Sequence, residues 1–393
     1  MTDYALDTPL DTDYYGVFAD VPAADREVWM RARAMVEQTM PEVNAAWDAA
    51  EYPLSWARRM GEMDLLNDGV AGPGLNQVSP LAAGLAMMEL HRGDGSIGTI
   101  AAVQAGLALR SIADYGSEAQ RERWLGPLSR GEELGAFALT EPEHGSDSVG
   151  LETSVRVEGD ELVLNGEKKW IGNGSVGHIT VVFARDEEGK VRGVLVPQDT
   201  PGYSATTITG KVALRAIHQA EITLTDVRVP ADSFLPGIAS FKDVSKILFA
   251  TRLGVAWSAL GHATAVFESA LSYAKQRIQF GKPLASFQMV QERLTEMLSD
   301  LVSLQLHCRQ LADLDAAGEM RPTQASLAKY TATRTARRMA STARDMLGGN
   351  GILLENHVVR HFADIEALHT YEGTESVQAL LVGRDLTGIG AFS

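Results

Sequence analysis

Cysteine is nearly absent from this 393-residue chain, in which Cys308 is the one thiol. A single cysteine excludes an internal disulfide and a thiolate cluster for zinc or iron–sulfur, and it favours a reducing compartment. Positive charge is also scarce, because 35 Lys and Arg face 51 Asp and Glu, for a formal charge of -16. Such a chain repels nucleic acid and anionic membranes, so we expect neither as a partner.

Targeting signals are also missing. The first twenty residues carry five Asp and no Lys or Arg, whereas secretory and organellar leaders begin with basic residues. The C-terminus lacks a peroxisomal Ser-Lys-Leu tail, and we find no apolar run of the roughly 18 residues that span a bilayer. The sequence therefore predicts a protein of the cytoplasm.

Apolar residues are plentiful at 45% of the chain, with 22% charged. These fractions predict two or three folded domains with a large core. In the first block, Ser79-Pro80 supplies a helix cap and a first-turn proline, and Ser117 with Gln120 makes a capping box. No convincing strand occurs there, so residues 1–132 are predicted to form a helical domain.

The period of the pattern changes to two in the second block. Apolar residues alternate over 179–183, and a turn at 186–189 separates them from a second alternating run. Asn165-Gly166 is typical of a hairpin turn. We expect a small antiparallel β domain over residues 133–238.

The helical period returns in the third block, over residues 239–393. Gly318 and Pro322 are predicted to end one of its helices. The fold class is therefore α+β, mostly α: an N-terminal helical domain, a middle antiparallel β domain and a C-terminal four-helix bundle.

Five short motifs place polar or small residues where chemistry is possible, although each alone has an ordinary structural explanation. In 137–147, FALTEPEHGSD, two hydroxyls stand beside free amides, which suits a cofactor ring or a phosphate as well as a capped turn. The segment 168–174, KKWIGNG, ends a predicted strand with an aromatic residue and glycines. A core tryptophan before a turn explains that segment equally well.

The last three motifs lie in the third block. RIQFGKPL at 277–284 suits a pyrophosphate or a solvated helix end, and MLGGNG at 346–351 suits an anion or a plain turn. In YEGT, at 371–374, a carboxylate stands between an aromatic residue and a glycine. Burying that carboxylate is costly unless its protonation has a task, but most glutamates are simply solvated.

The order of these motifs is more informative than any one of them. LTEPxxGSD, WIGN, R-x-x-FG-x-P-L, LGGNG and YEGT in this order resemble the acyl-CoA dehydrogenase family over nearly the whole chain. The chain is most similar to glutaryl-CoA dehydrogenases and plant short-chain acyl-CoA oxidases, through FKDVSKILFATR, QASLAKY and TYEGT. The resemblance implies the family fold, FAD, an acyl-CoA substrate, electron-transfer flavoprotein as oxidant and an oligomer, expected to be a homotetramer.

By this resemblance, Glu372 matches the family's base, which removes the α proton of a thioester while hydride leaves the β carbon. Arg252 lies on the helix that faces CoA. No metal is implied. The resemblance places the flavin against Phe137, Leu139, Thr140, Ser146, Trp170, Ile171, Gly172, Arg277, Gln279, Phe280, Gln288, Met346, Leu347, Gly348, Gly349, Gly351, Thr374 and Glu375. Of these, Arg277, Gln279, Phe280, Gln288 and the loop 348–351 are expected to act across a subunit boundary. It places the substrate against His91, Gly98, Thr99, Ser146, Arg252, Tyr371 and Gly373.

Departures from the family pattern bear on the substrate and the oxidant. Gly172 stands where many dehydrogenases have threonine. The plant oxidases also have glycine at this position. His91, Gly98 and Thr99 align with a glutamate, an arginine and a serine of the glutaryl-CoA enzymes. Without that guanidinium a second carboxylate is unpaired, at a cost of several kcal/mol. We therefore expect a short or branched acyl chain, with Gly98 leaving room for an uncharged tail.

Four other functions stay open at this point: a short-chain oxidase, a decarboxylating glutaryl-CoA dehydrogenase, a non-catalytic flavin- or acyl-CoA-binding protein, and a flavin monooxygenase. Retention of Glu372 disfavours the last two, which need no such base. His91 is either a proton relay in the pocket or a structural histidine. If the alignment of the pocket holds, Gly98→Arg should admit dicarboxylic esters.

Overall fold

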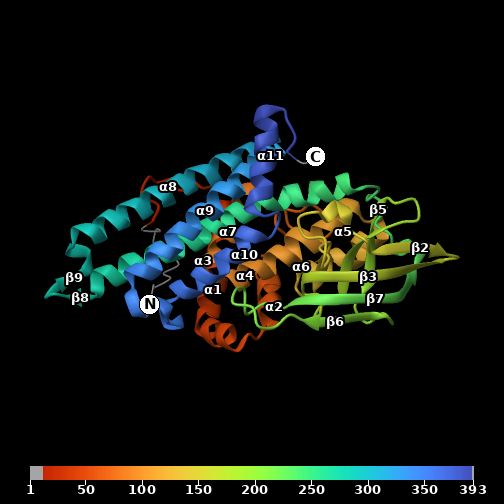
Figure 1. The fold of residues 1–393 in the computed structure, drawn as a ribbon, viewed down its shortest axis with the longest axis horizontal. Coiled ribbons are helices and arrows are strands. Elements are labelled where there is room, and N and C mark those ends of the chain that lie inside the picture. Colours follow the sequence, from red (N-terminus) through yellow and green to blue (C-terminus); the bar gives the residue numbers. More distant parts are fainter. Residues whose placement is uncertain (1–11, 392–393) are drawn as a thin grey trace.

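The computed structural model describes residues 12–391. Helices fill the left and centre of the view in Figure 1, and a curved sheet lies at the right. The first block contains α1 (Ala23–Ala49), α2 (Ser55–Glu62), α3 (Pro80–Gly93), α4 (Gly95–Ala101), a π-helical segment (Ala102–Leu109), α5 (Arg110–Tyr115) and α6 (Glu118–Ser129).

The predicted helix starts are confirmed. The Ser79 hydroxyl accepts from the Ala82 amide at 3.0 Å, with Pro80 in the first turn of α3. Ser117 and Gln120 form the reciprocal capping box of α6. These side chains satisfy amides that the first helical turn leaves without partners.

One helical segment corrects the expectation about apolar runs. Within residues 12–391, Gly95–Tyr115 is the one helix long and apolar enough to cross a membrane by length and composition. Its most apolar window is 78% buried inside the protein, as in the core helix of a soluble fold. The sequence analysis did not identify this segment because a few polar side chains interrupt its apolar run.

The second block forms the sheet. Its strands are β1 (Gly135–Ala138), β2 (Ser154–Glu158), β3 (Glu161–Gly172), β4 (Ile179–Arg185), β5 (Val191–Pro197), β6 (Tyr203–Thr207) and β7 (Gln219–Pro230). Their order is β1-β4-β2-β3-β7-β6, with β5 also paired to β4. Residues 179, 181 and 183 of β4 face the helical side, and 182 and 184 face the core between the curled strands.

Two predictions about this sheet are wrong in detail. The sheet is mixed, because β4 pairs in parallel with β1 and with the start of β2. Asn165-Gly166 makes no hairpin: it lies inside β3 at a bulge, where Asn165 bonds to Asp226 of β7. The hairpin between β2 and β3 turns instead at Gly159, which has a φ of 66°.

The third block is helical. It contains α7 (Phe241–Gln276), the hairpin strands β8 (Ile278–Gln279) and β9 (Lys282–Pro283), α8 (Gln288–Ala316), α9 (Pro322–Met346), α10 (Val358–Thr370) and α11 (Glu375–Thr387). Short 3₁₀ turns occur at 148–150, 231–233, 284–286, 348–352 and 354–356. α7, α8, α9 and α10 supply the predicted bundle, and α11 packs against α9.

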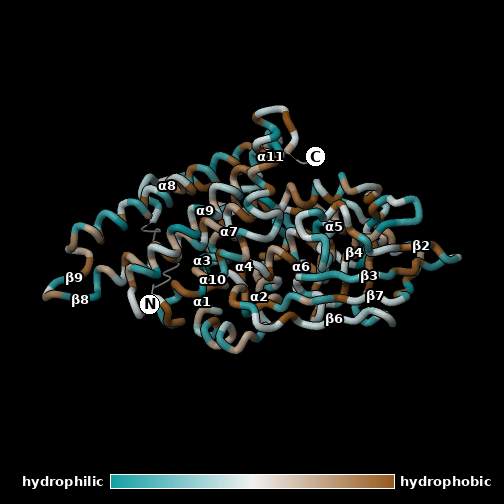
Figure 2. The backbone as a smooth tube through the Cα atoms, viewed as in Figure 1, coloured by the Kyte–Doolittle hydropathy of each residue, from teal (hydrophilic) through white to brown (hydrophobic). Residues whose placement is uncertain are grey.

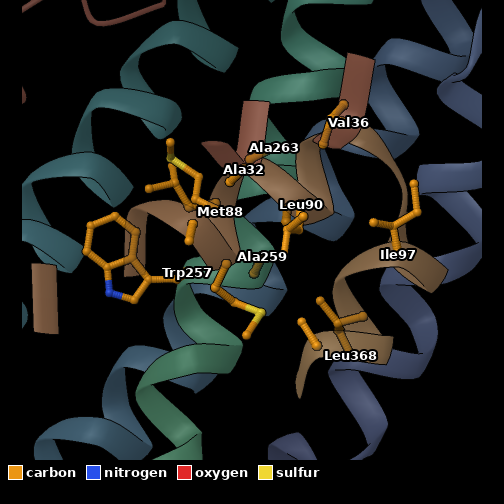
Figure 3. Packing of buried hydrophobic residues seen from close by; sticks show 14 of the residues in the cluster. Ala32, Val36, Met88, Leu90, Ile97, Trp257, Ala259, Ala263 and Leu368 are labelled. Atoms are coloured by element: carbon orange, nitrogen blue, oxygen red, sulfur yellow. The ribbon is translucent and has the colours of Figure 1, made fainter. Parts of the chain in front are cut away.

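The largest core lies where α1 and α3 meet α7, as Figure 3 shows around Trp257 and Met88. Small residues let α3 and α7 approach closely: a Cβ at Gly261 would lie 2.2 Å from the Met88 carbonyl oxygen. At the periphery, hydrophilic and hydrophobic residues alternate along α8 in Figure 2. Its inner residues, Met297 and Leu301 among them, are buried.

Candidate active site

Glu372 lies in the turn that joins α10 to α11. Its φ of 56° is left-handed, and Gly373 follows with a φ of 85°. A non-glycine residue adopts this conformation at an energetic cost, and such residues cluster at functional sites. The turn ends where the Thr374 hydroxyl accepts from the Val377 amide at the start of α11. The backbone therefore fixes the direction in which the Glu372 side chain leaves the turn.

The Glu372 carboxylate meets polar groups from two other helices. The Thr251 hydroxyl of α7 donates to Glu372 Oε2 at 2.8 Å. Burial raises the pKa of Glu372 above its ordinary value, while the Thr251 hydrogen bond and the charges of Lys329 and Arg252 lower it. A carboxyl group in such balanced surroundings can accept a proton near neutral pH.

Residues predicted to contact the acyl chain surround this turn. Burial raises the pKa of Tyr371, and an interaction with Thr99 of α4 opposes the rise. Gly373 has no room for a side chain, since a Cβ there would lie 2.5 Å from Gln378 Nε2. The structure thus brings Thr99, Tyr371 and Arg252 to the vicinity of Glu372.

Gly98 does not leave the space that the sequence suggested. A Cβ built at Gly98 would lie 2.0 Å from His91 Nδ1, so the imidazole occupies that volume. His91 is held there by its bond to the Met87 carbonyl oxygen at 3.0 Å. Gly98→Arg would therefore displace His91 rather than add a cation to an open pocket, and the expected gain of dicarboxylic substrates loses its basis.

His91 belongs to a buried histidine cluster, formed with His262 of α7 and His361 of α10. The rings of His91 and His262 are 5.5 Å apart, and His262 Nδ1 lies 2.8 Å from His361 Nδ1. Burial lowers the pKa of His91 to about 4 and holds the pKa values of the other two well below their usual range. Neutral, fully buried imidazoles favour the structural role of His91 over a proton relay.

The first group of predicted flavin residues lies at the end of β1. The Phe137 ring packs on Phe183 with centroids 4.7 Å apart. The Thr140 carbonyl accepts from the Lys169 amide of β3 at 2.9 Å. Buried Lys168 donates to the Leu139 carbonyl at 3.0 Å and to Glu141 at 2.9 Å. These bonds fix the segment that carries the Thr140 hydroxyl.

The Lys168–Glu141 ion pair is itself unusual in its burial. Burial alone would raise the pKa of Glu141, but Lys168 and two backbone amides lower it to about 2. Burial lowers the pKa of Lys168 to about 8, against the attraction of Glu141. Both groups therefore stay charged at neutral pH, and the pair ties the segment after β1 to β3.

Trp170 and its neighbours end β3 on the same edge. Trp170 is 54% exposed and has a left-handed φ of 65°, so its ring is free to cover a ligand. Ile171 is buried, and a Cβ at Gly172 would lie 2.8 Å from Val103 in the π-helical segment. The close approach of Val103 therefore explains why position 172 carries glycine and not threonine. Ser146 is exposed in the loop before the 3₁₀ turn at 148–150.

The second group of predicted flavin residues gathers at the other end of the molecule. A groove of about 400 Å³ is lined by Tyr273, Arg277, Gln279, Leu284 and residues 345–350, which include the carboxylate of Asp345. Figure 1 places the neighbouring β8–β9 hairpin at the far left, away from β3. One protomer thus separates the two groups, as expected if the second acts across a subunit boundary.

Other members of the second group differ in their surroundings. Phe280, at the tip of the hairpin, is 93% exposed with a φ of 52°, and Gln288 begins α8. Gly351 is buried, since a Cβ there would lie 2.2 Å from the Arg344 carbonyl oxygen. Glu375 bonds to His369 at 3.0 Å and pairs with Arg334, so its carboxylate is already engaged.

These surroundings fit FAD. The groove offers consecutive glycine amides beside a guanidinium, which suits a pyrophosphate, because Gly348 and Gly349 have nothing within 4 Å of a built Cβ. The opposite edge offers an uncovered indole and the fixed Thr140 hydroxyl for a planar ring.

The sequence analysis did not predict three residues at the site: Thr251, Lys329 and Gln378. Thr251 falls in the apolar stripe of α7, and Lys329 falls in the stripe of α9 made by Ala325, Ala328 and Ala332. A hydroxyl or an ammonium inside an apolar stripe was the available signal.

Comparison with known proteins agrees with this geometry. Residues 22–132, 136–227 and 241–387 match the N-terminal, middle and C-terminal domains of acyl-CoA dehydrogenase. The chain is 33% identical over 388 residues to the mitochondrial short-chain specific acyl-CoA dehydrogenase of Rattus norvegicus, covering 96% of this chain and 93% of that protein.

Solved structures are similar over the same extent. A glutaryl-CoA dehydrogenase from Mycobacterium smegmatis superimposes with a TM-score of 0.95 at 39% identity, over 97% of this chain and 99% of that one. A glutaryl-CoA dehydrogenase from the same organism in complex with FADH2 gives a TM-score of 0.95 at 35% identity, over 98% and 100%. This chain therefore belongs to the acyl-CoA dehydrogenase family of FAD-dependent oxidoreductases.

Proposed function

We propose that this chain oxidises a short or branched acyl-CoA to the 2-enoyl-CoA, with Glu372 as the base and electron-transfer flavoprotein as the electron acceptor. The observation that carries the proposal is the Glu372 turn: a strained backbone presents a carboxylate that burial makes basic and that Thr251 orients. Those are the requirements for abstracting a weakly acidic α proton.

In the proposed reaction, Glu372 takes the α proton of the thioester, and a double bond forms between Cα and Cβ. FAD, when bound, accepts the hydride that leaves the β carbon. Thr251 holds one carboxylate oxygen, so the other oxygen is directed toward the substrate. Exclusion of water by the helices around the turn keeps the carboxylate weakly solvated and therefore more basic.

The acyl end of the substrate is proposed to be uncharged. Position 98 carries no guanidinium, and the neutral His91 imidazole fills the adjacent volume. A distal carboxylate would meet no cation from α4 and would lose its hydration without compensation. We propose Thr99, Tyr371, Gly373, Ser146 and Arg252 as the remaining substrate contacts.

A second candidate is the oxidation and decarboxylation of glutaryl-CoA, which the similarity to the Mycobacterium smegmatis structures favours. Release of carbon dioxide from glutaryl-CoA by the purified enzyme would select this alternative. A third is an oxidase, which Gly172 favours because the plant oxidases that the sequence resembles share a glycine at this position. Fast reoxidation of the reduced flavin by air would select it.

The remaining assignments are also proposals. We assign both flavin groups to one FAD site completed by a partner subunit in a homotetramer, because one protomer holds the groups at opposite ends. Three domains, 1–132, 133–238 and 239–393, follow the changes from helix to sheet and back. We place the protein in the cytoplasm, with no metal and no nucleic-acid or membrane partner, on the composition of the sequence.

The test is Glu372→Gln, titrated anaerobically with butyryl-CoA, isobutyryl-CoA and glutaryl-CoA. The variant should keep its yellow flavin and bind these esters but bleach about 10²–10⁴-fold more slowly. Glu366→Gln is the control, because Glu366 is an exposed carboxylate of α10 paired with Arg337. Normal bleaching by Glu372→Gln would reject the base assignment.

A further inference from the structure

The backbone of the Glu372 turn is held by buried side chains. Lys329 Nζ, from α9, donates to the carbonyl oxygens of Tyr371 and Gly373, the residues on either side of Glu372. Gln378 Nε2, from α11, donates to the carbonyl oxygens of Glu372 and Gly373 at 3.0 and 3.1 Å. Three successive carbonyl groups therefore accept bonds from two neighbouring helices, and these bonds stabilise the left-handed conformation of Glu372.

Lys329 is costly to bury in this position. It is 1% exposed and lies among the small residues that pack α9 against its neighbours. Among the described residues, no salt bridge within 4.0 Å includes it. Burial lowers the pKa of Lys329 to about 7, against the attraction of the Glu372 carboxylate, so the side chain is partly protonated at neutral pH and more fully below it. A buried ammonium that bonds only to carbonyls beside the base is more than a packing element.

The other charged groups around this pair come from each adjoining helix. Arg252 of α7 adds positive charge near both Glu372 and Lys329. His369 of α10 lies near Lys329, but it bonds to Glu375 of α11. Within residues 12–391, Arg252, with a guanidinium Nε that is buried and unbonded, is the one cation besides Lys329 that acts on the base.

We propose that Lys329 is a positioning residue for proton abstraction: its bonds hold the turn that presents Glu372, and its ammonium form favours ionisation of that carboxylate. This inference rests on the proposed function of Glu372 as the base. Lys329 touches neither the substrate nor the flavin in this proposal, and it acts only through Glu372.

The test compares Lys329→Met, Lys329→Arg and Gln378→Leu by the pH profile of kcat/KM and by anaerobic flavin reduction. Loss of the charge raises the pH at which the base ionises, so Lys329→Met should move the acid limb upward by about one pH unit or more. Its reduction rate at pH 7 should fall at least about tenfold. Lys329→Arg should return the acid limb toward its original position, and Gln378→Leu should slow reduction without moving it.

Lys211→Met is the matched control. Lys211 is a half-buried lysine that also donates to two backbone carbonyls, those of Leu214 and Ile217, but it lies away from Glu372. This variant should lower stability and leave the pH profile unchanged. An unmoved acid limb in Lys329→Met overturns the proposal, and if that variant does not fold, an unmoved limb in Lys329→Gln does so.

The result of the Lys329 test can be distinguished from the result of the Glu372→Gln test. If Glu372→Gln reduces flavin normally, the base assignment fails whatever Lys329 does. If Glu372→Gln is slow while the charge-free Lys329 variants keep the normal pH profile, Glu372 remains the base and only the role of Lys329 is wrong.

Discussion

At the scale of single residues, the site depends on contacts that reach Glu372 from distant parts of the chain. Thr251 stands 121 positions away in sequence, yet its hydroxyl is the direct partner of the carboxylate. A hydrogen bond donated to a carboxylate favours the ionised form and lowers its pKa. Here that bond opposes the rise that burial causes.

Thr251→Val should therefore raise the pKa of Glu372 further. Valine removes the hydroxyl that donates to Glu372 but fills the same volume as threonine. The acid limb of the kcat/KM profile should therefore move upward by about one pH unit. Turnover should fall most below pH 7 and recover at higher pH. Steady-state kinetics between pH 5.5 and 9 measure this shift.

The control for this variant is Thr264→Val on the same helix. The Thr264 hydroxyl is buried and donates to the Leu260 carbonyl oxygen at 2.8 Å, away from Glu372. It should change stability slightly and leave the profile in place. Equal shifts in both variants would contradict the assigned role of Thr251.

At this scale, sequence motifs indicated candidate residues that the structure brings together, whereas contacts that depend on packing were missed. The YEGT motif led to Glu372, and the GGNG and RIQF motifs led to residues that share one groove. The expectation of an open pocket at Gly98 was wrong. A glycine suggests empty space in the sequence, but His91 from the preceding helix fills that volume. Contacts between helices, such as that of Lys329 with the turn, leave only one sequence signal, a polar side chain inside an apolar stripe.

At the scale of elements, close packing of α3 and α7 organises the helical core. Gly84 and Gly261 permit this approach, since Cβ atoms there would lie 2.3 Å from Trp257 and 2.2 Å from the Met88 carbonyl oxygen. Helix caps were predictable because they are local, with donor and acceptor a few residues apart. Strand direction was not, because β1 pairs with β4 across more than 40 residues, and turn composition does not reveal such a partner.

Gly261→Ala should separate α3 from α7 and destabilise the protein by about 1–3 kcal/mol or more, because backbone atoms cannot yield as side chains can. Gly254→Ala is the control on α7, where a built Cβ meets nothing within 4 Å. Alanine there should be neutral or stabilise by up to about 1 kcal/mol. Urea unfolding of the two variants measures the difference, and equal effects would contradict the packing argument.

At the scale of the whole molecule, the histidine cluster links α3 of the first block to α7 and α10 of the third block and makes stability depend on pH. Burial lowers the pKa of His91 to about 4 and that of His262 and His361 well below the usual value of about 6.5. The unfolded chain therefore binds protons below pH 6.5 that the folded protein refuses. Stability is complete above this pH and declines as the pH falls.

We expect the free energy of unfolding to fall by up to about 4 kcal/mol per pH unit from these three groups below pH 6. His361→Gln should reduce this slope by about a third, even if the variant is less stable at pH 7.5. Thr264→Val, which removes a buried hydroxyl of α7 and no titratable group, is the control and should keep the full slope. Urea midpoints between pH 7.5 and 5 test this, and an unchanged slope in His361→Gln would contradict it.

The long helix α7 has one more consequence for the molecule. Its 36 residues form a rod of about 54 Å that carries Thr251 near one end and leads into Arg277 at the other. Inserting a single residue between them would turn the distal hairpin by about 100° relative to the base. The number of helical residues between Thr251 and Arg277 therefore fixes the distance and the angle between these two regions. Homologues should vary this helix by substitution and not by length.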